Sequence, residues 1–462
     1  MKYFGTDGIR GKANVELDAK LAYRAGLALG TVLRKELDRR PLVLIGRDTR
    51  ISGGMLEAAL TAGLCTAGTD VTDLGVMPTP AVAYLTANTP AADAGIVISA
   101  SHNPFEDNGI KIFGSRGYKL TDSEEAQIEA YIDAPPALHM TGGQLGAVRP
   151  FEGDPVQAYV CHVASTAPCR LTGMRIAVDC ANGAASATAE ALFCRMGADA
   201  VILHQSPDGT NINAGCGSTH IEGLQELVRS GNFAAGAAFD GDADRCLMVD
   251  ETGELIDGDH LIGLLAEDMK RHGRLKGGVV GTILTNLGLH AFLEERQIPV
   301  WSTRVGDRYV LEAMREKGWN IGGEQSGHVI LSDYATTGDG QLTAVQFLCA
   351  LKASGAAASQ LNRRIESFPQ VSINVPVAND RKHQVAALPA VEQVGREIAE
   401  YFGGQGRVVI RPSGTEPKVR VMVEGRDPEQ VQQQAQRAAQ VVKAAVDALY
   451  SPCQFSGRRR VG

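Results

Sequence analysis

The order of elements along the chain constrains its fold more than any single motif does. Three times, short apolar runs alternate with segments of helical spacing, and each round ends in an apolar run, a polar loop and another apolar run. The polar loops lie at residues 99–104, 240–245 and 323–328. Strands that alternate with helices predict packed α/β layers, so we expect three domains of one mixed α/β sandwich topology.

The spacing of apolar residues also places the individual elements. The predicted strands lie at 41–46, 70–74, 95–99, 108–113, 174–179, 200–204, 234–239, 246–249, 278–283, 300–303, 371–377, 407–411 and 419–423, with a strand-loop-strand at 320–331. The predicted helices lie at 52–68, 79–87, 184–196, 220–230, 261–272, 288–295, 308–317, 340–354, 391–402 and 428–450.

After about residue 366 the elements become shorter and the pattern changes. A further polar loop lies at 411–417, and a long Gln- and Ala-rich helical segment follows it. This order predicts a smaller C-terminal α+β domain. The expected domains are 1–150, 151–252, 253–366 and 367–450, followed by a tail at 451–462 to which we assign no role.

Charge and cysteine content narrow the classes of function. The 462 residues carry a net charge of −8 and no concentrated basic face, which argues against a nucleic-acid partner. No run of about 18 apolar residues could span a membrane, and the N-terminal residues show no apolar signal region. Nine cysteines without a C-x-x-C pair are typical of reduced thiols, so we expect a cytoplasmic protein.

The loop at 240–245 carries three alternating carboxylates, Asp240, Asp242 and Asp244. In an extended chain they would all point the same way. Two unit charges about 4 Å apart repel by roughly 4 kcal/mol at an effective dielectric of 20, so converging carboxylates favour a bound cation. Ligands that are all oxygens favour Mg²⁺ or Ca²⁺ over zinc.

Two other interpretations of this loop are open. An EF-hand would use Glu251 as its twelfth residue, but the sixth residue is Arg245, where that turn needs glycine. The flanking segments are also predicted as strands rather than helices. Alternatively, Asp240 could be a phosphorylated nucleophile. Phosphate trapped in acid-stable form on Ser101 would exclude that chemistry.

The loop at 99–104 follows a buried strand, and α/β proteins hold their ligands at the carboxyl ends of such strands. Ser101, His102 and Asn103 place several hydrogen-bonding groups close together, and Pro104 restricts the backbone where the chain leaves the loop. Lys111, on the next strand, could return to the Ser101 hydroxyl. Ser-His-Asn-Pro is also ordinary turn chemistry, so this loop alone does not decide function.

Three further segments offer polar groups that could bind the hydroxyls or the phosphate of a ligand. Glu324 and Ser326 stand between glycines, which suits recognition of two hydroxyls, although a polar β-turn has the same composition. In the loop at 411–417, Arg, Ser, Gly and Thr residues form a plausible phosphate nest, which Arg420 could complete. Arg10 is presented between glycines near the N-terminus.

Five segments in this order resemble the α-D-phosphohexomutase superfamily: 4–11 (FGTDGIRG), 99–104 (SASHNP), 240–245 (DGDADR), 323–328 (GEQSGH) and 411–417 (RPSGTEP). The resemblance runs from residue 3 to about 450. It is specific because five loops agree in type and order. Three segments resemble the branch that acts on glucosamine phosphates: 2–11 (KYFGTDGIRG), 77–84 (MPTPAVAY) and 305–311 (VGDRYVL).

The resemblance implies four domains around a central cleft and an isomerase that interconverts glucosamine 6-phosphate and glucosamine 1-phosphate. Ser101 would carry the phosphoryl group, and a hexosamine 1,6-bisphosphate would be the intermediate and activator. One Mg²⁺ would bind Asp240, Asp242, Asp244 and the phosphoserine. Lys111, His102 and Arg10 would be catalytic. The implied substrate-binding residues are Arg245, Glu324, Ser326, His328, Arg411, Ser413, Gly414, Thr415 and Arg420.

Some alternatives and one departure accompany this resemblance. A phosphomannomutase/phosphoglucomutase would use the same chemistry on another sugar, and a catalytically silent sugar-phosphate-binding protein is a rival of another class. The resemblance implies small sugar phosphates as the binding partners. It is also compatible with a homodimer. Ala243 stands where many relatives have glycine, which the turn should tolerate unless it needs a positive φ.

Overall fold

The computed structural model describes residues 2–5, 7–135, 140–413 and 417–450. The chain forms two compact units. The first holds residues 1–285 and 289–365, and the second holds residues 286–288 and the chain from Glu366 onward.

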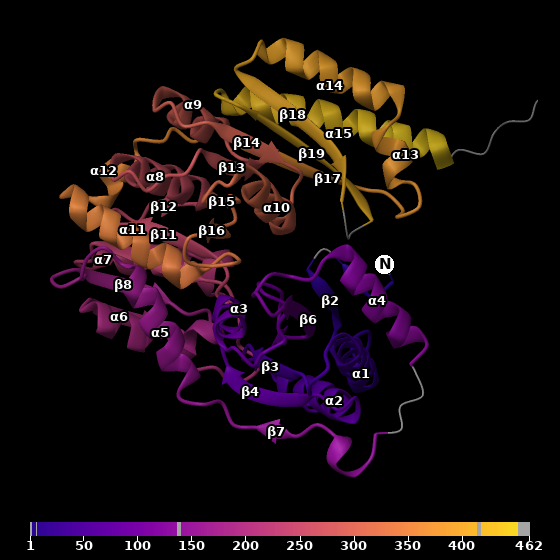
Figure 1. The fold of residues 1–462 in the computed structure, drawn as a ribbon. Coiled ribbons are helices and arrows are strands. Elements are labelled where there is room, and N and C mark those ends of the chain that lie inside the picture. The colour runs from indigo at the N-terminus through magenta and orange to yellow at the C-terminus, as the bar shows by residue number, and fades with distance from the viewer. Residues whose placement is uncertain (1, 6, 136–139, 414–416, 451–462) are drawn as a thin grey trace, which may run out of the picture. The chain divides into compact units, whose positions relative to one another are not determined.

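The first sheet of the first unit has seven strands in the order β1-β2-β6-β5-β3-β4-β7 (Figure 1). Its strands are β1 (Phe4–Gly5), β2 (Gly8–Lys12), β3 (Leu42–Arg47), β4 (Asp70–Val76), β5 (Ala94–Ile98), β6 (Asp107–Gly114) and β7 (Val148–Arg149). Strand β3 pairs in parallel with β4 and β5, whereas β6 runs antiparallel to β5. The sequence pattern did not predict β1, β2 or β7.

The second and third sheets have the orders β12-β11-β10-β8-β9 and β14-β13-β15-β16. Their strands are β8 (Arg175–Asp179), β9 (Asp199–Leu203), β10 (Ala235–Phe239), β11 (Cys246–Asp250), β12 (Leu255–Ile256), β13 (Val279–Thr282), β14 (Val300–Thr303), β15 (Ile321–Gly323) and β16 (Val329–Leu331).

The three sheets share one four-stranded core. In each, the fourth strand in chain order lies beside the third, then come the first and the second: β6-β5-β3-β4, β11-β10-β8-β9 and β16-β15-β13-β14. Each polar loop connects the third strand to the antiparallel fourth. The threefold repeat predicted from the order of elements is therefore confirmed.

Helices cover both faces of these sheets (Figure 1). They are α1 (Ala19–Glu36), α2 (Gly53–Thr66), α3 (Thr79–Asn88), α4 (Asp122–Asp133), α5 (Pro155–Thr166), α6 (Ala189–Met196), α7 (Glu222–Ser230), α8 (Gly258–Arg271), α9 (Leu287–Glu295), α10 (Asp307–Lys317), α11 (Gly340–Ser354) and α12 (Ala358–Asn362). Alternation along β3 directs Val43 and Ile45 toward the core formed with α1 and α2, and Leu44 toward the core that includes α3. The predicted helix at 184–196 is interrupted at Thr188, with a 3-10 turn before it.

One continuous apolar core joins the three α/β domains. It includes Leu44 of β3, Phe193 of α6 and Phe347 of α11, all of them buried. Burying apolar side chains from three sheets in one cluster explains why these domains form a single unit, because separating them would expose that surface to water.

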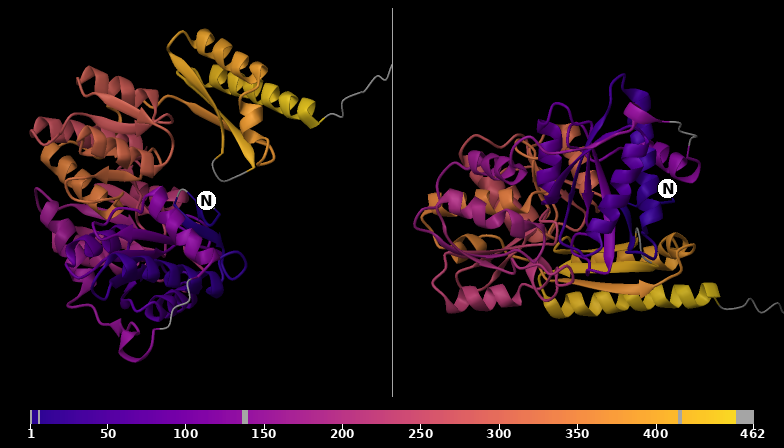
Figure 2. Two further views of the ribbon diagram at one scale, coloured as in Figure 1. Left: turned by 45° about the vertical axis from the view of Figure 1, so that its right-hand side comes forward. Right: turned by 90° about the horizontal axis from the view of Figure 1, so that it is seen from below.

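The second unit is a three-stranded antiparallel sheet covered by helices, as the sequence predicted (Figure 2). Its elements are β17 (Gln370–Pro376), α13 (Lys382–Ala386), α14 (Pro389–Phe402), β18 (Gly406–Pro412), β19 (Lys418–Gly425) and α15 (Pro428–Tyr450). Val419, Val421 and Val423 of the central strand β19 pack on α14 and α15. Because strand residues alternate, Arg420 lies on the opposite face.

The described residues bear on two expectations from composition, those about cysteines and about membrane-spanning segments. All eight cysteines in the described part of the chain are free thiols. Within the same residues, no helix combines the length and apolar character needed to cross a membrane.

Helices α1 and α2 approach so closely that glycine is required at their crossing. A Cβ atom at Gly63 would collide with the carbonyl oxygen of Tyr23 and lie 2.7 Å from the Leu27 nitrogen. Gly26 on α1 faces the Leu60 carbonyl in the same way. In contrast, a Cβ atom at Gly54 of α2 would meet nothing within 4 Å.

Two glycine-to-alanine substitutions in α2 should therefore change stability in opposite directions. We expect Gly63→Ala to lower the free energy of unfolding by about 1–3 kcal/mol, because backbone atoms cannot move away from the new methyl group. Gly54→Ala should raise it by about 0.5–1 kcal/mol through helix propensity. Urea unfolding followed by circular dichroism measures both. Equal effects of the two substitutions would contradict the close approach.

Candidate active site

The loop after β5 and the loop after β10 meet at Ser101. The Ser101 hydroxyl donates a 2.5 Å hydrogen bond to Oδ2 of Asp240. Thr79, at the start of α3, joins the same loops because its backbone N–H and its hydroxyl donate to the backbone and the side chain of Asp242. The structure thus brings together the serine and the acidic loop that the sequence singled out.

Ser101 has a left-handed backbone conformation, with φ of 54°. Such a conformation is unfavourable for a non-glycine residue and needs support from its surroundings. The Ser101 carbonyl oxygen accepts hydrogen bonds from Arg50 and from Asn213, each 2.9 Å long. The Ser101 N–H donates to the hydroxyl of Ser99. These contacts hold the loop from both sides and aim the Ser101 side chain at Asp240.

Arg50 is the main support of this loop, and its side chain is completely buried. Its guanidinium pairs with Asp48 at 2.9 Å and donates to the carbonyl oxygens of Ser101, Asn103 and Asp107, and also to that of Pro104. The hydroxyl of Ser99 donates to the same Asp48 carboxylate. A planar group with five donors can bind Asp48 and four carbonyls at once, whereas a lysine has only three donors.

Asp240, Asp242 and Asp244 converge as expected, but not because the chain is extended. All three are buried, and one oxygen of each lies within 4.8 Å of the others. Residues 241–244 form a turn and a bend, in which Ala243 has φ of 57°. The expectation from strand alternation was wrong on this point. The turn does use a positive φ at Ala243, the condition under which alanine is strained relative to glycine.

The electrostatics of this cluster fit a bound cation. Burial and the neighbouring Asp244 and Asp242 raise the pKa of Asp240 to about 8. Burial also opposes ionisation of Asp244, but Lys111 and His328 outweigh it and hold the pKa of Asp244 well below its usual range. Among the described residues, Oδ1 of Asp242 and Oδ1 of Asp244 are buried without a hydrogen-bond partner. Buried carboxylate oxygens that make no hydrogen bond are what a hard divalent cation would ligate.

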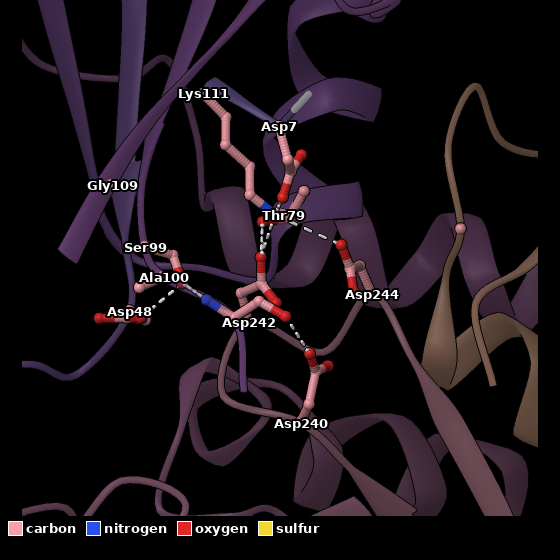
Figure 3. Close-up of polar contacts among 12 residues, drawn as sticks. Asp7, Asp48, Thr79, Ser99, Ala100, Gly109, Lys111, Asp240, Asp242 and Asp244 are labelled. Atoms are coloured by element: carbon pink, nitrogen blue, oxygen red, sulfur yellow. Dashed lines mark hydrogen bonds and ion pairs between the residues drawn. The ribbon is translucent and has the colours of Figure 1, made fainter. Parts of the chain in front are cut away.

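Lys111 reaches this cluster from β6 (Figure 3). Its ammonium lies 2.8 Å from Asp242, 3.4 Å from Asp244 and 3.3 Å from Asp7. These three carboxylates raise the pKa of Lys111 well above its ordinary value although burial opposes this, so the side chain is charged. The sequence suggested an approach to the Ser101 hydroxyl. In the structure the ammonium contacts carboxylates instead.

A row of paired charges extends from Asp7 away from the carboxylate cluster. Asp7 also pairs with Arg10 and with Lys119, and Lys119 in turn pairs with Asp307 at the start of α10. Arg10 therefore stands at the edge of the cluster, with Nη1 3.5 Å from the Ala100 carbonyl oxygen. Partly buried charges of alternating sign connect the first and third α/β domains through this row.

His102 lies beside the serine in its neutral form. Its Nδ1 is 3.4 Å from the Ser101 hydroxyl and 3.1 Å from Nη1 of Arg245. Desolvation and the nearby guanidinium groups of Arg245 and Arg10 lower the pKa of His102 to about 4. Because Arg245 can only donate, Nδ1 accepts and the ring proton is on Nε2.

The loop between β15 and β16 adjoins the acidic loop. Cys246 at the end of the acidic loop donates its backbone N–H to the Gly327 carbonyl. His328 is buried, with Nδ1 3.6 Å from Asp244, and its Nε2 accepts from the Gly338 N–H. Glu324 is half-buried and accepts from the Gly306 N–H, whereas Ser326 is exposed. Glu324 and Ser326 are therefore placed where a ligand can reach them.

The second unit presents its own basic loop. Arg411 on β18 and Arg420 on β19 are direct cross-strand partners, so both side chains lie on one face of the sheet. Like charges directly opposite each other destabilise a strand pair, and a bound anion would relieve this. Ser413 follows and is buried. Gly414 and Thr415, which the sequence also assigned to this loop, lie outside the described residues.

Several residues of the site were not identified from the sequence. Arg50, which pairs with Asp48, was not among the residues that the sequence assigned to the site. Asn213 carried no local signal, and Thr79 stood only within the segment 77–84 that carries the resemblance. Their contacts reach Ser101 and Asp242 across long sequence separations. Only the tertiary fold could reveal them.

Neutralising one carboxylate should separate metal binding from folding. In metal-free protein, we expect Asp240→Asn to raise the thermal midpoint, because a neutral amide avoids the cost of burying a carboxyl beside Asp242 and Asp244, the same cost that raises the pKa of Asp240. With Mg²⁺ at about 100 times its Kd, the wild type should gain about 2.7 kcal/mol, and the variant much less. Differential scanning calorimetry with and without chelator measures both effects. Exposed Asp199→Asn is the control, and an equal Mg²⁺ response in Asp240→Asn would contradict the site.

Comparison with known proteins now identifies the family. Four phosphoglucomutase/phosphomannomutase domain models match the chain. Three are α/β/α domains, I at residues 1–137, II at 157–253 and III at 257–368, and the C-terminal domain matches residues 373–441.

Individual relatives agree with these matches. Phosphoglucosamine mutase of Shouchella clausii is 50% identical and covers 97% of this chain and 100% of its own. That of Desulforudis audaxviator is 51% identical and covers 92% and 94%. A phosphoglucomutase/phosphomannomutase family protein from Burkholderia thailandensis has a similar structure, with 26% identity, a TM-score of 0.80 and coverage of 96% and 97%. The chain therefore belongs to the phosphoglucosamine mutase family, within the phosphoglucomutase/phosphomannomutase proteins.

Proposed function

We propose that the protein interconverts glucosamine 6-phosphate and glucosamine 1-phosphate, for UDP-N-acetylglucosamine synthesis, with a phosphoserine at Ser101. The observation that carries this proposal is the buried Ser101 hydroxyl bonded to Asp240 within a cluster of three carboxylates. Two relatives about 50% identical over nearly the whole chain are phosphoglucosamine mutases, which supports the substrate.

The phosphoryl group of Ser101 would pass to the free hydroxyl of the bound hexosamine monophosphate. The Ser101 Oγ–P bond breaks, a sugar O–P bond forms, and the proton of the sugar hydroxyl replaces the phosphoryl group on Ser101. The product of this step is the 1,6-bisphosphate. In the second step the other phosphoryl group returns to Ser101 and the monophosphate isomer is released, so no water is consumed.

Positioning and charge neutralisation are the main requirements of phosphoryl transfer. Lys111 and Arg10 would supply fixed positive charge beside the transferred group. His102, neutral in this structure, would exchange a proton at Nδ1, the nitrogen that lies 3.4 Å from the Ser101 hydroxyl. When bound by Asp240, Asp242, Asp244 and the phosphoserine, Mg²⁺ would neutralise charge on the phosphoryl oxygens.

Substrate recognition would be divided among loops. Glu324 and Ser326 would bind sugar hydroxyls, with Arg245 and His328 completing the surroundings. The phosphate that is not reacting would be held by the basic loop of the second unit, whose implied members are Arg411, Ser413, Gly414, Thr415 and Arg420. The opposed pair Arg411 and Arg420 supports an anion there.

Ser101 differs from the nucleophile of a hydrolase in the group that it contacts. Its hydroxyl donates to a carboxylate, and the adjacent imidazole belongs to a histidine of lowered pKa. We therefore propose that Ser101 must be phosphorylated before turnover, with a hexosamine 1,6-bisphosphate as the activator. Free thiols at all eight described cysteines support action in the reducing cytoplasm.

A comparison of substrates tests this function. With Mg²⁺ and a trace of hexose bisphosphate, kcat/KM should be highest for glucosamine 6-phosphate, above glucose 1-phosphate and mannose 1-phosphate. A site that hydrogen-bonds the C2 amino group should discriminate against sugars that lack it, because its polar groups are then left unpaired. A preference for mannose or glucose phosphate would favour the phosphomannomutase/phosphoglucomutase alternative. Ser101→Ala should lose all turnover and all covalent phosphate in intact mass spectra, whereas exposed Ser230→Ala should lose neither.

Arg50 provides a separate test of loop positioning. Arg50→Lys retains a charge for Asp48 but cannot reach four carbonyls, so the Ser101 loop should lose its geometry. A displacement of about 1 Å can reduce a rate about 100-fold, and we expect kcat to fall by that order while KM changes little. Exposed Arg39→Lys is the matched control. If kcat for Arg50→Lys stayed within twofold of the wild type, the loop would not depend on this guanidinium.

A further inference from the structure

A second cluster of metal-binding side chains lies in the middle α/β domain, outside the carboxylate cluster. Asp179 ends β8, His204 follows the adjacent parallel strand β9, and Cys216 lies on the loop that precedes α7. One ligand atom from each lies within 4.8 Å of the others, and Asp179 Oδ1 is 2.9 Å from His204 Nδ1. The carboxyl ends of parallel strands are where α/β domains bind ligands.

The donor set distinguishes this cluster from the carboxylates around Ser101. It offers one oxygen, one nitrogen and one sulfur, and thiolate and imidazole ligands are typical of zinc and its transition-metal neighbours rather than of Mg²⁺. Ligand atoms bound to zinc at about 2.0–2.3 Å in a tetrahedron lie roughly 3.3–3.8 Å apart. The observed cluster is within about 1 Å of that spacing.

The residues around the cluster hold it in place. The backbone N–H groups of Ala181 and Gly217 donate to the two oxygens of Asp179, at 2.8 and 2.9 Å. Asn182 Nδ2 lies 3.9 Å from the Cys216 sulfur. Hydrogen bonds that orient the ligating side chains are a regular feature of metal sites.

Burial and backbone conformation are also consistent with a built site. Asp179 and Cys216 are each 1% exposed, whereas the His204 side chain is 39% exposed and leaves a path for an ion. Ala181, Asn182 and His204 all have left-handed φ values, between 47° and 55°. Three strained non-glycine residues around one point indicate that the surrounding structure over-determines their geometry, which is common at functional sites.

We propose that Asp179, His204 and Cys216 form a binding site for one transition-metal ion of the zinc class, with solvent as the fourth ligand. Binding displaces the thiol proton of Cys216 to solvent, because the ligand is the thiolate. The site holds the loop at 211–217 to the ends of β8 and β9. The same loop carries Asn213, which donates to the Ser101 carbonyl, so the ion would stabilise one support of the catalytic loop.

The proposal is tested on the full chain after metal removal, with Co²⁺ as a spectroscopic probe. One equivalent of Co²⁺ should produce thiolate-to-cobalt charge-transfer absorption, which a site made only of carboxylates cannot produce. Cys216→Ser should abolish this absorption, and His204→Ala, at an exposed side chain, should weaken Co²⁺ binding at least 10-fold. Asp240→Asn and the exposed-thiol control Cys194→Ser should retain it.

Zinc alone supplies an independent measurement. It should raise the thermal midpoint of the wild type and of Asp240→Asn, but not those of Cys216→Ser or His204→Ala. No charge-transfer band at stoichiometric Co²⁺, or a band that persists in Cys216→Ser, would overturn the site. A zinc response that persists in both site variants would also overturn it. None of these measurements uses turnover, so their outcome is separate from that of the mutase assay.

Discussion

The buried charge of Asp240, Asp242 and Asp244 is the constraint around which the first unit is organised. Three carboxylates within 4.8 Å of one another repel strongly, and their own domain places Arg245 beside them, 3.9 Å from Asp244. Lys111 comes from the first α/β domain, and His328 from the third. These contacts form only when the three domains are docked in one arrangement, which the shared apolar core maintains.

The catalytic loop depends on a second buried charge. Arg50 and Asp48 pair completely out of water, a costly arrangement unless every donor is used. Here the guanidinium also bonds four carbonyls of the loop, and Asn213 supports the Ser101 carbonyl from the next domain. The left-handed conformation of Ser101 is thus held by rigid neighbours, and its hydroxyl is preorganised toward Asp240 before any ligand arrives.

Sequence patterns predicted the strands and helices of the repeated sheets well, and they failed where tertiary contacts override local preference. Residues 19–36 were not predicted as a helix. Gly26 lowers helix propensity there, yet it is needed for the close approach of α2. The acidic loop was expected to be extended, whereas a turn with a positive φ at Ala243 makes the carboxylates converge. The contacts of Lys111 were also misjudged, because its carboxylate partners come from distant parts of the chain.

By itself, the sequence determined the threefold α/β order, the chemistry carried by each polar loop and the family resemblance. These properties depend on residue types at short spacings, where local periodicity and turn composition are sufficient. Only the tertiary structure decided which groups face one another: Ser101 with Asp240, Arg50 with the loop carbonyls, and Asp179 with His204 and Cys216. The physical reason is that burial and electrostatic pairing act between residues far apart in the chain, and these interactions exist only after the sheets have packed together.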